Sequence, residues 1–80
     1  MTINDAVASR ILKLLKEKNM SQYRLEQNSG IAHGAMDRIL NCQNKTITLT
    51  TLYRLARGFD LNIFEFLDEE TFLSNEIEID

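Results

Sequence analysis

Apolar residues recur along the chain with the spacing expected of amphipathic helices. In the first segment they form a stripe at i, i+4, i+7 and i+8, made of Val7, Ile11, Leu14 and Leu15. Such spacing gathers side chains on one helix face that can turn toward a core. We therefore predict a helix that begins near Asn4 or Asp5, either of which can cap it, and ends near Lys18. Asn19 suits a left-handed residue just after that end.

Residues 21–40 read as two short helices with a glycine between them. Ser21 can cap the first helix, Gly30 breaks the run, and a second helical period extends from about Ala32 to Leu40. Four apolar positions fall where two crossing helices would touch: Leu25, Ile31, Met36 and Ile39. Crossing helices joined by a residue that tolerates positive φ form a helix-turn-helix, although any helical hairpin can share this spacing.

Two more helices follow a polar loop. Thr48 can cap a helix from Leu49 to Phe59, and Asn62 can open another, with Glu65 placed to complete a capping box. The last helix carries more apolar residues than a small monomer needs, namely Ile63, Phe64, Phe66 and Leu67. They indicate either a homodimer contact or completion of the core. The pattern as a whole predicts a five-helix, all-α fold.

Composition narrows the possibilities. Eighty residues without proline form one small domain, which we place at residues 1–69. No stretch has the roughly 18 apolar residues of a membrane span, and the first residues lack a secretion signal. Cys42 is the only cysteine, so neither an internal disulfide nor a cysteine metal site is expected. We expect a cytoplasmic protein without cofactor or metal.

Charge is distributed unevenly along the chain. All nine Lys and Arg residues lie between Arg10 and Arg57, so residues 1–59 carry a net charge of +5, whereas residues 60–80 carry −8. A basic body suits a phosphate-binding surface, while the acidic end should avoid DNA. We expect Arg10 and the first-helix lysines to lie mostly off the apolar stripe, in solvent. Residues 70–80 are interpreted as an acidic tail, disordered alone and ordered only against a second chain.

The segment from Ile11 to Leu67 resembles the Cro and phage-repressor type of helix-turn-helix domain, the XRE family. The resemblance rests on an ordered set of matches: Met20, Ser21, Gln22, Leu25, Gly30, Ile31, Met36, Ile39, Leu52, Leu55 and Ala56. It implies a lambda-repressor-like fold in which the second and third helices, on either side of Gly30, form the helix-turn-helix, and helix 3, roughly Ala32 to Leu40, enters the major groove of DNA.

Several positions depart from the family pattern. Glu26 occupies a place where relatives usually have alanine, and Ser29 replaces an aliphatic residue. Ala32 stands where a capping serine or threonine is common, and Cys42 where the helix commonly ends with glycine. Leucines at 15 and 40 replace an arginine–glutamate pair, a change that packed apolar groups can tolerate. The departures at Glu26, Ser29, Ala32 and Cys42 lie next to helix 3 or in the helix that packs on it, and they can change how helix 3 is positioned.

The resemblance, together with side-chain chemistry, predicts a set of DNA-contacting residues. These are Gln22, Arg24, Ala32, His33, Gly34, Asp37, Arg38, Asn41, Asn44 and Lys45. In the family, the glutamine at position 22 hydrogen-bonds a phosphate and braces the first contact residue of helix 3. Arg38 is the strongest candidate for a base edge or phosphate, and His33 can donate to either. Asp37 is expected to be a solvated acid unless it accepts from cytosine or orients Arg38.

The remaining candidates have plainer roles. Lys45 lies in a polar loop, residues 41–48, where relatives contact the DNA backbone, and such contacts position the protein without reading sequence. Arg24 can reach a phosphate or point into water. Gly34 can permit close approach of the backbone, although it weakens the helix. Arg54 and Arg57 are assigned to solvent or to neighbouring acids.

We therefore expect a sequence-specific transcriptional regulator, a repressor, that binds a two-fold DNA site as a homodimer through helix 5 and the tail. The alternative is a protein-interaction module of the same fold with weak or no DNA binding, such as an antitoxin-like or anti-repressor partner. An enzyme is disfavoured because the chain has one histidine, no metal-ligand cluster and no glycine-rich phosphate loop. No membrane or small-molecule partner is expected.

Overall fold

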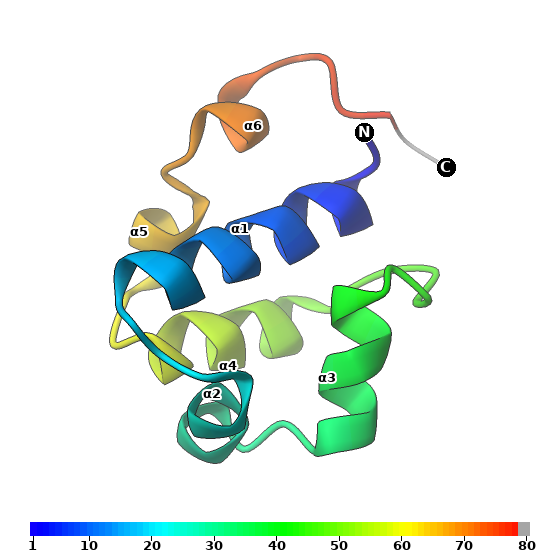
Figure 1. Cartoon of the computed structure of the whole chain (residues 1–80). Helices are drawn as coiled ribbons and strands as arrows, with labels where there is room; N and C mark the ends of the chain where they lie inside the picture. The colour runs from blue at the N-terminus through cyan, green and yellow to red at the C-terminus, as the bar shows by residue number, and fades with distance from the viewer. Residues whose placement is uncertain (79–80) are drawn as a thin grey trace.

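The structure, a computed structural model, describes residues 1–78, and that part of the chain folds into helices without a sheet (Figure 1). The helices are α1 (Ile3–Glu17), α2 (Gln22–Ser29), α3 (His33–Leu40), α4 (Leu49–Gly58), α5 (Ile63–Leu67) and α6 (Glu70–Leu73). The predicted all-α fold is confirmed. The short α6 was not predicted, and it brings the number of helices described to six.

Side-chain caps set most of the helix boundaries. Ser21 and Thr48 each accept a hydrogen bond from the backbone three residues on, and Asn62 forms the predicted capping box with Glu65. Gly30 adopts the expected left-handed conformation, with φ of 73°. The start of α1 was predicted wrongly. Its cap is Thr2, which forms a capping box with Asp5.

The core is built where α2 packs on α4, α1 on α3 and α5 on α4 (Figure 1). Six large side chains are completely buried there: Ile11, Leu25, Met36, Leu55, Phe59 and Phe66. Gly58 allows α4 to approach α2 closely, because a Cβ atom at this position would lie 2.8 Å from Leu25 Cδ1 and 3.0 Å from Ser29 Cβ. This packing fixes α2, and through Gly30 it also fixes the start of α3.

Arg10 corrects the expectation that the basic residues of α1 point into solvent. Its side chain is buried, and it donates from Nε to the carbonyl of Phe66 at 2.7 Å and from Nη2 to that of Glu65 at 2.9 Å. Nη1 lies 3.1 Å from Glu69 Oε2, which also binds Lys13. Periodicity within α1 could not reveal this role, because the partners lie 55 to 59 residues away in the chain.

The acidic tail also differs from expectation. Phe72 of α6 packs against Phe66, with ring centroids 6.4 Å apart, and Glu78 donates its N–H to the carbonyl of Met1 at 3.0 Å. A parallel bridge joins Thr2 to Glu78. Residues 70–78 are thus ordered within a single chain, against its own N-terminus, and the expectation of disorder in isolation is wrong for them. Part of the alternating run that led to the disorder prediction, residues 79–80, lies outside the described residues.

Candidate nucleic-acid interface

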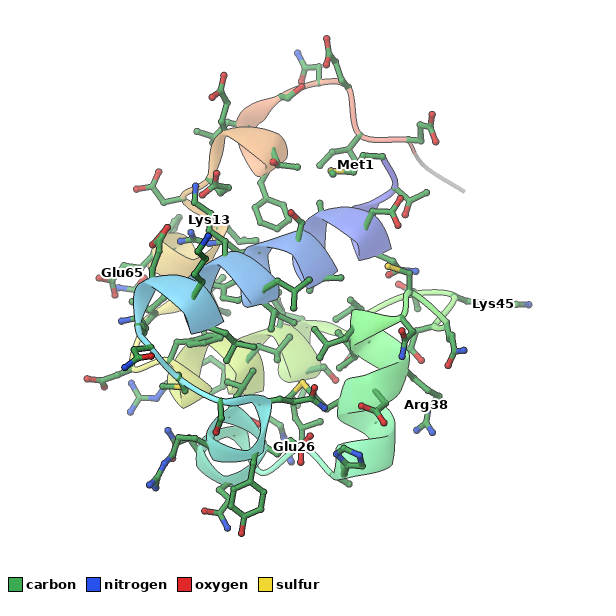
Figure 2. The ribbon with its side chains drawn as sticks, viewed as in Figure 1. Met1, Lys13, Glu26, Arg38, Lys45 and Glu65 are labelled. Carbon is green, nitrogen blue, oxygen red and sulfur yellow. The ribbon has the colours of Figure 1, made fainter. Side chains whose placement is uncertain are left out.

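The helix-turn-helix occupies one side of the molecule. Figure 2 shows that Arg38, from α3, and Lys45, from the loop after it, both point away from the body on the same side. Lys13 and Glu65 lie on the opposite side, with α1 and α5. Gln22 belongs to the α3 side, because its side chain is hydrogen-bonded to Asp37. The structure therefore brings Gln22, Arg38 and Lys45 into one region.

Every predicted contact residue reaches the surface. Seven are exposed, namely Arg24, Ala32, His33, Gly34, Arg38, Asn41 and Lys45, and three are half-buried, namely Gln22, Asp37 and Asn44. Ala32 is the N-cap of α3 and provides no side-chain cap. The first N–H groups of this helix consequently have no side-chain partner.

Four side chains form a hydrogen-bonded network across the joint of α2 and α3. We call Gln22, Glu26, His33 and Asp37 the Glu26 network. Glu26 Oε2 lies 2.8 Å from both Gln22 Nε2 and His33 Nδ1. Gln22 Nε2 also donates to Asp37 Oδ1 at 2.9 Å, and His33 Nε2 lies 3.2 Å from Asp37 Oδ2. Three hydrogen bonds and this ion-pair contact together close the network into a ring.

The network shifts the pKa values of His33 and Glu26. The hydrogen bond with Glu26, and then the charges of Asp37 and Glu26, raise the pKa of His33 above its ordinary value of 6.5. Hydrogen bonds from Gln22 and His33 lower the pKa of Glu26 below 4.5. Both shifts favour a charged pair at the start of α3.

These contacts correct two predicted roles. Asp37 is not simply a solvated acid, because it accepts from Gln22 and pairs with His33. Gln22 does not brace His33 directly. Glu26 does so, and sequence analysis did not count it among the contact residues. The signal was present in the acidic residue at a position where relatives usually have alanine.

Three cations of the predicted set remain without an ion pair among residues 1–78: Arg24, Arg38 and Lys45. Arg38 lies along the bare face of Gly34, with Nη1 3.8 Å from the place of a Cβ atom there. These three cations are thus available to an external anion. Asn41 is less available, because its amide donates to the carbonyl of Asp37 at 2.8 Å.

The loop after α3 is held in place from within the protein. Asn4, at the start of α1, is buried and donates from its amide to the carbonyl of Asn44. Cys42 takes a left-handed conformation, with φ of 56°, at the position where relatives commonly have glycine. These features fix the backbone of the loop beneath Lys45.

A shallow groove of about 490 Å³ runs between α3 and the beginning of α4. Ala32 and Ala35 line it on the α3 side, and Thr48, Thr51 and Arg54 line it on the α4 side. Arg54 was assigned to solvent from the sequence, yet it borders the same region as α3. The structure therefore adds a cation to the edge of this surface.

Comparison with known proteins gave a match to a protein family. A family model described as "Cro/C1-type HTH DNA-binding domain" matches residues 10–71. Neither the curated proteins nor the solved structures yielded a match. No helix in residues 1–78 is long and apolar enough to cross a membrane.

Proposed function

Because the chain belongs to the Cro/C1-type helix-turn-helix DNA-binding family, we propose that it is a sequence-specific transcriptional repressor that binds a two-fold DNA site as a homodimer. The DNA-binding unit comprises residues 1–69, and residues 70–80 form an appended acidic tail. The cytoplasm is the proposed location, since DNA is the proposed partner.

One observation carries this proposal. Arg38 and Lys45 point outward on the α3 side and have no ion pair among residues 1–78. By contrast, the cations of α1 nearest the acidic end, Arg10 and Lys13, are neutralised by Glu69. A cation that is not neutralised within the protein can replace counterions on DNA phosphates. Arg38 and Lys45 therefore supply positive charge that no residue among 1–78 neutralises, at the place where a recognition helix would dock.

The dimer is proposed through α5 and α6. Phe64 is 87% exposed and Leu73 is 72% exposed, and a shallow groove of about 340 Å³ lies beside them. Large exposed apolar side chains that share a patch are typical of protein contacts. In Figure 1, α5 and α6 lie on the other side of the molecule from α3, so pairing through them leaves α3 uncovered. Binding to successive major grooves of a two-fold site requires the two α3 helices of the dimer to lie about 34 Å apart.

The test is a comparison of three alanine variants on selected DNA. Duplexes would be selected from a random library with the wild-type protein, and affinity measured by fluorescence anisotropy. Arg38→Ala should reduce discrimination between selected and random duplexes, by about 1–3 kcal/mol if it contacts a base edge. Lys45→Ala should weaken both alike. Lys13→Ala removes the same charge from the opposite side and should leave binding nearly unchanged.

The interaction-module alternative also has an observation in its favour. Gln22, His33 and Asp37 are bonded to Glu26 or to one another, which leaves few free donors on α3. If wild-type protein fails to bind any duplex at low salt, the DNA-binding function is wrong and this alternative replaces it. If light scattering shows that the wild-type protein is a monomer at micromolar concentration, the proposed dimer is wrong. If the wild type is a dimer, Phe64→Ser should shift it toward the monomer, because Phe64 lies in the proposed contact.

A further inference from the structure

Glu26 occupies the joint between α2 and α3, and its carboxylate is almost closed off from solvent. Its side chain is 10% exposed, whereas that of His33 is 71% exposed. A carboxylate with so little exposed surface can make little direct contact with DNA. It can, however, hold in place the neighbouring side chains that would contact DNA.

The first side chain that Glu26 fixes is Gln22. An amide nitrogen carries two hydrogens, and those of Gln22 are directed to Glu26 at 2.8 Å and to Asp37 at 2.9 Å. Because both partners are carboxylates, the nitrogen and not the oxygen must face them. The carbonyl oxygen is the atom left for an outside partner. It can accept from a base amino group, but Gln22 cannot donate to a phosphate while the network is closed.

The second side chain is His33. Its two ring nitrogens face carboxylates from different helices, Glu26 of α2 and Asp37 of α3. A neutral imidazole has a single N–H, so one nitrogen would turn a lone pair toward a carboxylate. The imidazolium makes both contacts favourable, because Nδ1–H donates to Glu26 and the positive charge attracts Asp37. The closed ring therefore favours the protonated histidine.

Protonation changes the charge that this surface presents. With Glu26 and Asp37 ionised, the network carries −1 when His33 is protonated and −2 when it is neutral. DNA phosphates repel the second state more strongly. DNA binding should consequently favour the proton on His33, and by linkage acidification should favour DNA binding.

We propose that Glu26 is a positioning residue for DNA recognition, which holds the Gln22 amide and the His33 ring in one arrangement and makes DNA affinity depend on the protonation of His33. This proposal rests on the proposed DNA-binding function.

The first experiment uses the free protein. His33 is the only histidine, so NMR of the ring protons follows one titration without assignment ambiguity. The pKa of His33 should lie above 6.5 in the wild type and fall in Glu26→Gln. Glu17→Gln removes an acid from the end of α1 and should leave that pKa nearly unchanged. If circular dichroism shows that Glu26→Gln is poorly folded, the titration is made with Glu26→Ala instead, which has the residue type common in relatives at this position.

The second experiment measures affinity for a random-sequence duplex at pH 6 and pH 8. Affinity changes roughly tenfold for each unit by which DNA raises the pKa of His33. We expect the wild type to bind about threefold tighter at pH 6 through this linkage. Glu26→Gln and His33→Asn should lose most of that ratio, whereas Lys45→Ala should bind more weakly but keep it.

The outcomes separate the two proposals. An unchanged His33 pKa in Glu26→Gln, or an unchanged pH ratio, overturns the role of Glu26 while DNA binding stands. Absence of DNA binding at low salt overturns the DNA-binding function and with it the role of Glu26 in recognition, even if the NMR titration responds to Glu26→Gln.

Discussion

Two networks of similar chemistry lie on opposite sides of this small protein. In one, Glu69 binds Arg10 and Lys13 and ties α1 to the segment between α5 and α6. In the other, Glu26 binds Gln22 and His33 at the helix-turn-helix. The Arg10 side chain is 9% exposed, whereas that of His33 is 71% exposed and has a pKa raised above 6.5. The first network serves stability at any physiological pH, and the second leaves a surface whose charge can change.

The largest expected effect tests the stability role. Arg10→Ala removes a buried guanidinium and leaves the carbonyls of Glu65 and Phe66 without their donor. We expect a loss of about 3 kcal/mol in the free energy of unfolding, measured with denaturant, because breaking a buried pair leaves polar groups unsatisfied. Lys13→Ala removes an exposed partner of the same Glu69 and should cost much less. Equal losses would mean that burial does not distinguish the two cations.

A smaller change in the free energy of unfolding, this time a gain, is expected from a substitution in α3. Gly34→Ala adds a methyl group to α3 where only Arg38 lies nearby, at an ordinary contact distance of 3.8 Å. The helix should gain up to about 1 kcal/mol from the better helix former. DNA affinity should fall if the backbone approaches DNA at this point. A variant that gains stability and binds as before would show that Gly34 has no part in the interface.

The smallest effect concerns pH. Because the pKa of His33 is raised, its stabilising contribution is complete below 6.5 and is lost as pH rises through the folded-state value. The pKa of Glu26 is lowered, so its contribution is present above 4.5 and is lost on acidification. Wild-type protein should therefore lose some stability between pH 6 and pH 8. Thermal unfolding of His33→Gln should show less of this loss.

The Glu69 network should not respond over that interval. The hydrogen bond between Lys13 and Glu69 raises the pKa of Lys13 above 10.5 and lowers the pKa of Glu69 below 4.5. Their contributions persist from above pH 4.5 to below pH 10.5. A Lys13→Ala variant should thus retain the wild-type change between pH 6 and pH 8. If it does not, the two networks are coupled.

Local signals in the sequence predicted much of the fold. Ser21, Thr48 and Asn62 were recognisable as caps because a cap and its partner are three residues apart. Gly30 was recognisable because few other residues tolerate its φ. The family match over residues 10–71 confirms the resemblance that these signals supported.

Distant contacts could not be predicted in this way. Arg10 was interpreted from the sequence as a solvated base, because the carbonyls that accept its hydrogen bonds lie more than 50 residues away. The tail read as disordered because its partner, the backbone of Met1, is at the other end of the chain. Among the site residues, the link from Glu26 to His33 crosses the turn, so helical spacing within α2 or α3 does not reveal it.

The central claim is that the free cations on the α3 side bind duplex DNA. It is tested most directly by titrating wild-type protein onto a random-sequence duplex at increasing salt concentration. Arg38 and Lys45 predict that the logarithm of the affinity falls linearly with the logarithm of salt, with a slope of roughly −2 per chain. Absence of binding at the lowest salt, or an affinity that does not change with salt, would contradict the account.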